Sequence, residues 1–160
     1  MTNRVQENRD KKNFPSANQI AWLVPVTFLV HQIEEYLGQF PLWYSNLLKA
    51  ELSNQDFIVI NAVGLFVFTA LSLSYLFNRN NIILAALGTL IFVNGISHLL
   101  LSVFTLTYSP GTISGIVLFI PLGSIIFRKI FPQLSEGERI TAIAIGIFVL
   151  FMVSMIAMNI

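Results

Sequence analysis

Five long apolar segments, separated by short polar turns, constrain this chain more than any other feature of its sequence. They cover residues 19–37, 57–77, 82–105, 112–127 and 140–158. A helix needs about 20 apolar residues to cross the roughly 30 Å hydrocarbon core of a bilayer. Charged residues make up 11% of the chain, about half their usual share in soluble domains. The sequence therefore predicts an all-α integral membrane bundle of about five transmembrane helices.

The basic residues are unevenly distributed between the two sides that five spans would create. With the N-terminus inside, only Lys49 among the nine Lys and Arg residues falls in an outer loop. Cytoplasmic loops of membrane proteins carry an excess of Lys and Arg. We therefore expect the N-terminus on the inner side of the membrane and the C-terminus on the outer side. The expected location is the cell membrane (the inner or plasma membrane). Residues 1–18 would form a polar, basic cytoplasmic tail, and residues 19–160 a single transmembrane domain.

An aromatic segment follows the first span. Phe40, Trp43 and Tyr44 lie close together there around Pro41, and aromatic residues gather at membrane–water interfaces. Residues 42–51 therefore predict a short helix that lies on the membrane surface.

The composition excludes several classes of function. The chain contains no Cys, which excludes disulfides, thiolate nucleophiles and Cys-ligated metal sites. It also has no basic stripe interleaved with aromatic residues, so we expect no nucleic-acid partner. The expected partners are the lipid bilayer and a lipid-like or apolar small molecule.

The first span carries a cluster of ionisable residues that is costly in hydrocarbon. His31, Glu34 and Glu35 all lie within its apolar run. A charged side chain at the centre of a membrane helix costs roughly 2.5–3.5 kcal/mol. Residues three and four apart share a helix face, with Cβ atoms about 5–6 Å apart. The spacing therefore predicts one polar site, around which the other helices fold.

Other polar residues fall at a similar depth in the predicted bundle. His98 lies on the third span, which also rises from the inside, about as far along it as the cluster lies along the first. Asn61 joins this layer near the outer start of the second span, and Thr112 and Ser114 join it at the outer start of the fourth. Both histidines of the chain thus share one layer with both intramembrane carboxylates. We expect a site in the outer half of the bilayer.

Two imidazoles and two carboxylates suffice to bind a divalent transition metal such as Zn, Fe or Mn. Their order matches neither the H-E-x-x-H nor the H-x-x-E-H helix of zinc enzymes, nor the E-x-x-H of ferritin-like sites. The candidate metal ligands and catalytic residues are His31, Glu34, Glu35 and His98. The candidates for orienting a ligand or contacting a substrate are Asn94, Asn61 and Tyr108.

The stretch His31-Gln32-Ile33-Glu34-Glu35 in a first membrane helix resembles the signature of the bacterial HXXEE domain family. Asn94-x-x-x-His98 and the turn Tyr108-Ser-Pro-Gly111-Thr112 are also similar to that family, and the resemblance covers about residues 22–121. It implies a small multi-pass membrane protein. The signature positions that the resemblance implies are His31, Glu34, Glu35, Asn94 and His98, with Tyr108, Pro110 and Gly111 as the accompanying turn. It implies no activity, because the function of the family is uncharacterised.

The leading hypothesis is a metal-dependent membrane enzyme, a hydrolase or oxidoreductase, that acts on a lipid or apolar small molecule. A metal-free acid–base isomerase would use the same His and carboxylate groups. A proton-coupled transporter also needs such groups within the membrane. Because the chain shows no internal repeat of the kind common in carriers, a homodimer would have to supply the second half. A further alternative is a structural subunit of a membrane complex, in which these residues only bond helices together.

Overall fold

The computed structural model describes residues 15–49 and 51–159, and these residues fold into helices joined by short connections. The elements are α2 (Ala17–Leu37), α3 (Phe40–Leu48), α4 (Asn54–Asn78), α5 (Asn81–Thr105), α6 (Thr112–Ser114), η1 (Gly115–Phe119), α7 (Ile120–Ile130), η2 (Phe131–Gln133) and α8 (Glu136–Met158). No strand occurs in the residues described. The prediction of an all-α fold is confirmed. The expected cytoplasmic tail, residues 1–18, lies largely outside the described residues.

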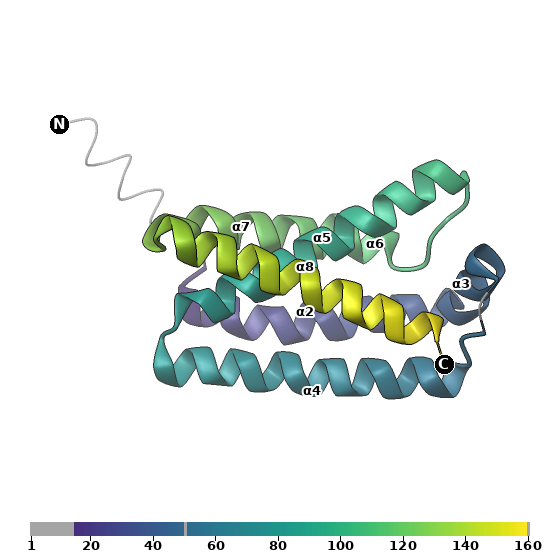
Figure 1. Ribbon diagram of the computed structural model, residues 1–160, viewed down its shortest axis with the longest axis horizontal. Helices are drawn as coiled ribbons and strands as arrows, with labels where there is room; N and C mark the ends of the chain where they lie inside the picture. Colours follow the sequence, from purple (N-terminus) through teal and green to yellow (C-terminus); the bar gives the residue numbers. More distant parts are fainter. Residues whose placement is uncertain (1–14, 50, 160) are drawn as a thin grey trace.

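Five long helical stretches correspond to the five predicted spans and lie side by side along the longest axis of the molecule (Figure 1). Four of them are long and apolar enough to cross a membrane, namely Asn54–Asn78, Asn81–Thr105, Thr112–Gln133 and Glu136–Met158. The remaining one, α2, is less apolar because its second half contains His31, Gln32, Glu34 and Glu35. The fold is therefore an integral membrane bundle of about five long helices.

Short polar side chains determine where the long helices begin. Ser16 accepts a hydrogen bond from the Gln19 N–H in a capping box that starts α2, and Ser135 forms the same motif with Glu138 at the start of α8. Ser53 caps α4. These hydroxyls satisfy N–H groups that have no partner within the helix. These three helices consequently begin two to four residues before the apolar segments from which their spans were predicted.

A separate short helix follows the first span, as expected, but α3 covers Phe40–Leu48 rather than residues 42–51. Gln39 adopts a left-handed conformation with φ 58°, which turns the chain between α2 and α3. Figure 1 shows α3 at the same end of the bundle as the C-terminus and the connection between α5 and α6. Its position on the membrane surface, and the N-inside orientation, remain predictions.

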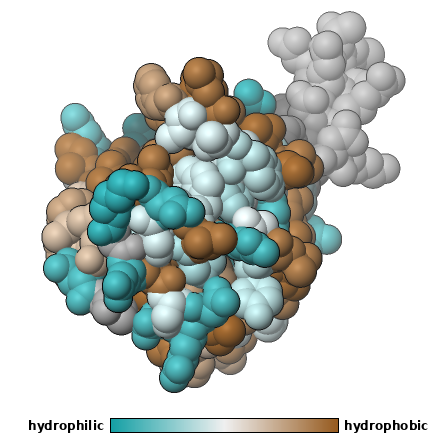
Figure 2. Space-filling view, turned by 90° about the vertical axis from the view of Figure 1, so that its right-hand side faces the viewer, coloured by the Kyte–Doolittle hydropathy of each residue, from teal (hydrophilic) through white to brown (hydrophobic). Residues whose placement is uncertain are grey.

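Polar residues gather over this end of the bundle. Figure 2 shows hydrophilic and weakly polar residues over much of this end, with apolar residues between them and along much of its edge. Such a pattern suits an end that faces water while its sides face lipid. The apolar faces of α4 and α8 are largely exposed, with only 17% of each candidate span buried, as expected of helices that contact a bilayer.

The helix α5 packs against α2, α4, α7 and α8 and so forms the centre of the bundle. Small residues allow close approach of its neighbours. Gly95 of α5 faces Gly115, where an added Cβ would lie 3.2 Å from the Gly95 Cα. Gly146 of α8 lies directly against the α5 backbone. Close contacts between small residues are a common source of affinity between helices in a membrane.

Replacing Gly146 by Val is expected to weaken the contact between α5 and α8. A Cβ at this position would lie 2.8 Å from the Ala86 carbonyl oxygen and 2.8 Å from the Thr89 Cβ, so α8 must move away. Overpacking of this kind costs about 1–3 kcal/mol, measurable as a lower melting temperature in mild detergent. Gly137→Ala is the control, because an added Cβ there meets no described atom within 4 Å. An equal loss in both variants would contradict the packing argument.

Candidate metal site

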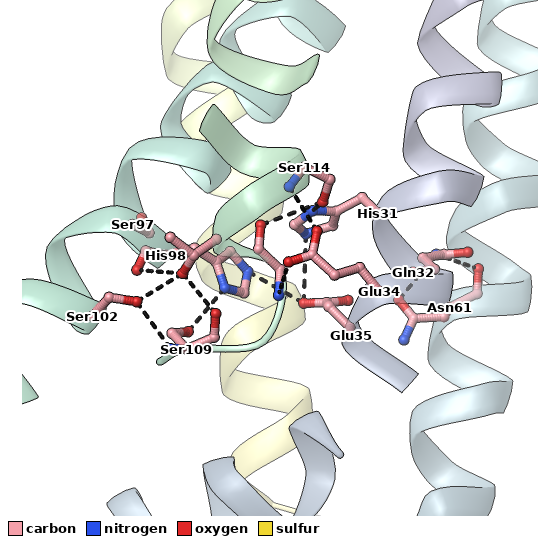
Figure 3. A network of polar contacts seen from close by, with 12 residues as sticks. His31, Gln32, Glu34, Glu35, Asn61, Ser97, His98, Ser102, Ser109 and Ser114 are labelled. Atoms are coloured by element: carbon pink, nitrogen blue, oxygen red, sulfur yellow. Dashed lines mark hydrogen bonds and ion pairs between the residues drawn. The ribbon is translucent and has the colours of Figure 1, made fainter. Parts of the chain in front are cut away.

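Two histidines and one glutamate meet inside the bundle, and we call them the His–Glu–His cluster. His31 and Glu35 lie one turn apart on α2, and His98 faces them from α5 (Figure 3). Glu35 Oε1 lies 3.5 Å from His31 Nε2 and 3.2 Å from His98 Nε2. The three residues are only 2%, 7% and 5% exposed in chain order. Residues 67 positions apart in the sequence, His31 and His98, thus share one carboxylate oxygen.

Each imidazole is held on its other side by a serine hydroxyl. His31 Nδ1 lies 2.7 Å from Ser114 Oγ, and His98 Nδ1 lies 3.1 Å from Ser109 Oγ. A hydroxyl can donate or accept a hydrogen bond. If it accepts from Nδ1–H, Nε2 keeps a lone pair for a metal; if it donates to Nδ1, Nε2 carries an N–H that can donate to Glu35. The serines therefore suit both a metal-bound and a metal-free site.

The donor atoms of the His–Glu–His cluster have the spacing of a metal site. They all lie within 4.8 Å of one another. Ligands at about 2.0–2.2 Å from a tetrahedral Zn²⁺ are separated from each other by about 3.3–3.6 Å, close to the distances of 3.5 Å and 3.2 Å from Glu35 Oε1 to the two Nε2 atoms. His31 Nε2 also has no hydrogen-bond partner among the residues described. The cluster can therefore hold a metal ion.

Aromatic rings and a bare stretch of backbone enclose the cluster. The His31 ring lies 4.3 Å from the Phe119 ring, and the His98 ring lies 5.7 Å from that of Phe40, centroid to centroid. Gly111, with φ +99°, passes so close that a Cβ there would lie 2.8 Å from His31 Cε1 and 2.9 Å from His98 Cε1. These neighbours exclude water and strengthen electrostatic interactions within the site.

The second glutamate of the motif points elsewhere. Glu34 accepts hydrogen bonds from the backbone N–H groups of Gly111 (3.2 Å), Ile113 (3.0 Å) and Ser114 (2.6 Å), and from the Tyr108 hydroxyl. Sequence spacing groups Glu34 with the candidate metal ligands, whereas the structure places its carboxylate on the connection between α5 and α6. The reason is that this connection presents several N–H groups to α2, and a carboxylate is a strong acceptor for them.

Tyr108 forms a hydrogen bond to Glu34 rather than to a residue of the His–Glu–His cluster. Its hydroxyl donates to Glu34 Oε1 from the α5–α6 connection. Burial, the hydrogen bond to Glu34 and the charge of that carboxylate together raise the pKa of Tyr108 to about 12. The hydroxyl therefore stays protonated, and keeps donating, through neutral and mildly alkaline pH.

The two asparagines predicted near the site have separate positions. Asn61 accepts a hydrogen bond of 3.0 Å from Gln32 Nε2 through its side-chain oxygen and another of 3.0 Å through its backbone oxygen. This pair joins α2 to α4 beside the cluster (Figure 3). Asn94 Oδ1 is buried without a hydrogen-bond partner among the described residues. Among the described residues, neither asparagine makes a hydrogen bond to His31, Glu35 or His98.

Sequence reasoning missed the role of the hydroxyl groups around His98. Ser102 Oγ accepts from the Ser109 N–H at 2.9 Å and lies 2.7 Å from Thr112 Oγ1, while Thr112 Oγ1 also donates to the His98 carbonyl oxygen at 3.2 Å. One signal was available, because Ser102 lies four residues after His98 and hence on the same helix face. The contact of Ser109 depends on the path of the loop, which helical spacing does not predict.

A comparison with protein families returned a model described as a protein of unknown function with HXXEE motif, which matches residues 22–126. This range includes the His–Glu–His cluster, Glu34 and the whole connection between α5 and α6. The comparisons with curated proteins and with solved structures returned no match.

Proposed function

Because the chain belongs to the family of proteins of unknown function with an HXXEE motif, we propose its function from the site itself. The chain is a membrane-embedded, metal-dependent enzyme that acts on a lipid or another apolar small molecule. His31, Glu35 and His98 bind the metal. Three of the four metal ligands expected from the sequence, the two histidines and Glu35, are thus retained. Glu34 has a different role.

One observation carries this proposal. Both imidazole Nε2 atoms are directed at the same carboxylate oxygen, at 3.5 Å and 3.2 Å, while both Nδ1 atoms contact serine hydroxyls. Metal-binding histidines almost always engage their second ring nitrogen in such a hydrogen bond, because it fixes the ring and its tautomer. Helix–helix adhesion alone requires neither this arrangement nor two histidines on one oxygen.

The composition of the site favours catalysis over a purely structural metal. Catalytic zinc sites keep three protein ligands and one position for a water or substrate, and this cluster offers three donors. A bound metal would supply Lewis-acid chemistry, which polarises a carbonyl or phosphoryl oxygen or acidifies a water. Glu35 would neutralise part of the metal's charge, and the serines would hold the imidazoles in place. The apolar rings of Phe40 and Phe119 suit a substrate with an apolar body.

Metal analysis of the purified protein in mild detergent tests this proposal. We expect a near-stoichiometric transition metal in the wild type and less than a tenth of it in His31→Ala and in His98→Ala, because each variant leaves two ligands. Gln32→Leu is the matched control, since it removes a polar contact on the same helix without touching the cluster. A wild type that neither contains metal nor gains heat stability from added Zn²⁺, Mn²⁺ or Fe²⁺ would overturn the proposal.

A second candidate function is proton handling, by an acid–base isomerase or a proton-coupled carrier. It is supported by a line of exchangeable groups that runs from Ser114 through His31, Glu35 and His98 to Ser109. Such groups can pass a proton along without a metal. Reconstituted vesicles distinguish the two functions: substrate-coupled proton flux in metal-free protein, lost in Glu35→Gln, would support this second function and contradict the first.

A further inference from the structure

The two adjacent glutamates of the motif have different partners. Glu35 faces the two imidazoles, whereas every described hydrogen-bond partner of the Glu34 carboxylate belongs to residues 108–114. Glu34 Oε1 accepts from Tyr108, Gly111 and Ile113, and Oε2 accepts from the Ser114 N–H. A buried or half-buried carboxylate with several donors is held firmly, because hydrogen bonds to charged groups are worth about 1.5–3 kcal/mol each. The same bonds hold the donors, and hence the loop.

The segment that Glu34 holds is the one that carries both serines of the site. The N–H of Ser114 binds Glu34 at 2.6 Å, and the hydroxyl of the same residue binds His31 at 2.7 Å. Ser109, which contacts His98 at 3.1 Å, is joined to Gly111 through Pro110. Pro110 packs against the end of α2, where a Cβ on Gly38 would lie 2.7 Å from the proline Cβ. The loop therefore has little freedom to move relative to α2.

We infer that Glu34 is a positioning residue, which acts on the two histidines through the loop. By holding residues 108–114 against α2, it places the Ser114 hydroxyl on His31 and the Ser109 hydroxyl on His98. The two carboxylates of the motif thus have different roles. Glu35 contacts the imidazoles directly, and Glu34 orients them through the loop serines, which contact the opposite ring nitrogens. Metal affinity is one readout of this role, and it depends on the proposed function. The orientation of the imidazole rings is a second readout, which does not depend on it.

Glutamine is an informative replacement because all described partners of Glu34 are donors. An amide of the same size has one acceptor oxygen and one NH₂ group, which is itself only a donor. Whichever way it is turned, Glu34→Gln places an NH₂ against at least one N–H or O–H of the loop. The variant therefore loosens the loop without creating a cavity. Tyr108→Phe is a milder second variant that removes one donor and leaves the three backbone bonds in place.

The experiment compares the wild type, Glu34→Gln and Tyr108→Phe, with Gln32→Leu as the control on the same helix. Hydrogen exchange of the Gly111, Ile113 and Ser114 amides reports whether the loop is held. Nitrogen-15 NMR of the imidazoles in metal-free protein reports the state of each ring nitrogen. Competition with a chromophoric chelator gives the Zn²⁺ affinity of the folded protein, and the absorption bands of bound Co²⁺ report ligand geometry.

We expect Glu34→Gln to speed exchange of the loop amides, shift the nitrogen signals of both histidines and weaken Zn²⁺ binding about 10- to 100-fold, the usual effect of removing a group that supports a ligand. Tyr108→Phe should change the same quantities less, and Gln32→Leu should change none. In a Ser109→Ala/Ser114→Ala background, Glu34→Gln should weaken binding no further, since residues that act as one unit are not additive.

Faster loop exchange with unchanged histidine signals would overturn the inference, since Glu34 would then only fasten the loop. Unchanged loop exchange in Glu34→Gln and Tyr108→Phe would overturn it as well. A wild type without Zn²⁺ affinity would contradict the proposed metal enzyme, and the nitrogen signals of the metal-free protein would then decide the inference on their own.

Discussion

Replacing Glu35 by Gln is expected to abolish metal binding, by 1,000-fold or more in affinity, on the order of 4 kcal/mol. Glu35 is the one carboxylate in the His–Glu–His cluster and is almost fully buried. Without it, a divalent cation would sit in a site of low dielectric between two neutral imidazoles, with no negative charge to offset the loss of its hydration. Chelator competition on purified protein measures the effect directly.

The stability of the same variant provides a control for folding. In metal-free protein, Glu35→Gln keeps the shape of the side chain but removes the carboxylate that faces both imidazoles, and removing one partner of a buried pair is destabilising. We therefore expect metal-free Glu35→Gln to melt below the metal-free wild type, while still unfolding in one cooperative transition. Added Zn²⁺ should raise the melting temperature of the wild type only. Equal metal affinity in the two proteins would contradict the proposed ligand set.

The all-helical bundle was predictable from the sequence because the bilayer demands long apolar helices. Each of the five predicted spans coincides with a long helical stretch, and four of these stretches are long and apolar enough to cross a membrane. Their ends were less predictable. The fourth apolar segment stops near residue 127 because Arg128 and Lys129 follow it, yet the helical stretch continues to Gln133. Arg128 and Lys129 end the apolar run but not the helix, because both are good helix formers and basic residues are favourable in a last turn. Lys129 also donates to the Pro15 carbonyl oxygen at 2.5 Å, a distant partner about which local hydropathy contains no information.

The meeting of His31 and His98 was predicted by depth alone, since both lie at similar heights on helices that run in the same direction. The division between Glu34 and Glu35 was not predictable in this way. Both lie within helical reach of His31, at spacings of three and four, and neighbouring positions on a helix differ by about 100° in direction. The path of residues 106–111 decides which carboxylate meets the histidines, and that path has no periodic signal in the sequence.

Gly111 is the residue at which a single added methyl group is expected to do most damage to the fold of the site. Its φ of +99° belongs to a conformation that residues with a Cβ rarely adopt. A Cβ there would also lie 2.8 Å from His31 Cε1, 2.9 Å from His98 Cε1 and 3.0 Å from His98 Nδ1. Gly111→Ala therefore combines backbone strain of about 1–3 kcal/mol with displacement of both imidazoles at once.

We expect Gly111→Ala to lower the melting temperature and to weaken metal binding at least 100-fold, because neither ring can keep its place on Glu35. Gly64→Ala is the packing control: its Cβ would lie 3.1 Å from the Phe28 ring, a milder crowding between α2 and α4 that leaves the cluster untouched. This control should keep its metal. Wild-type affinity in Gly111→Ala would show that the loop backbone does not constrain the histidines, whereas loss of metal in both variants would mean that binding depends on general packing. The contrast between the two glycines thus tests whether the loop forms part of the site or only covers it.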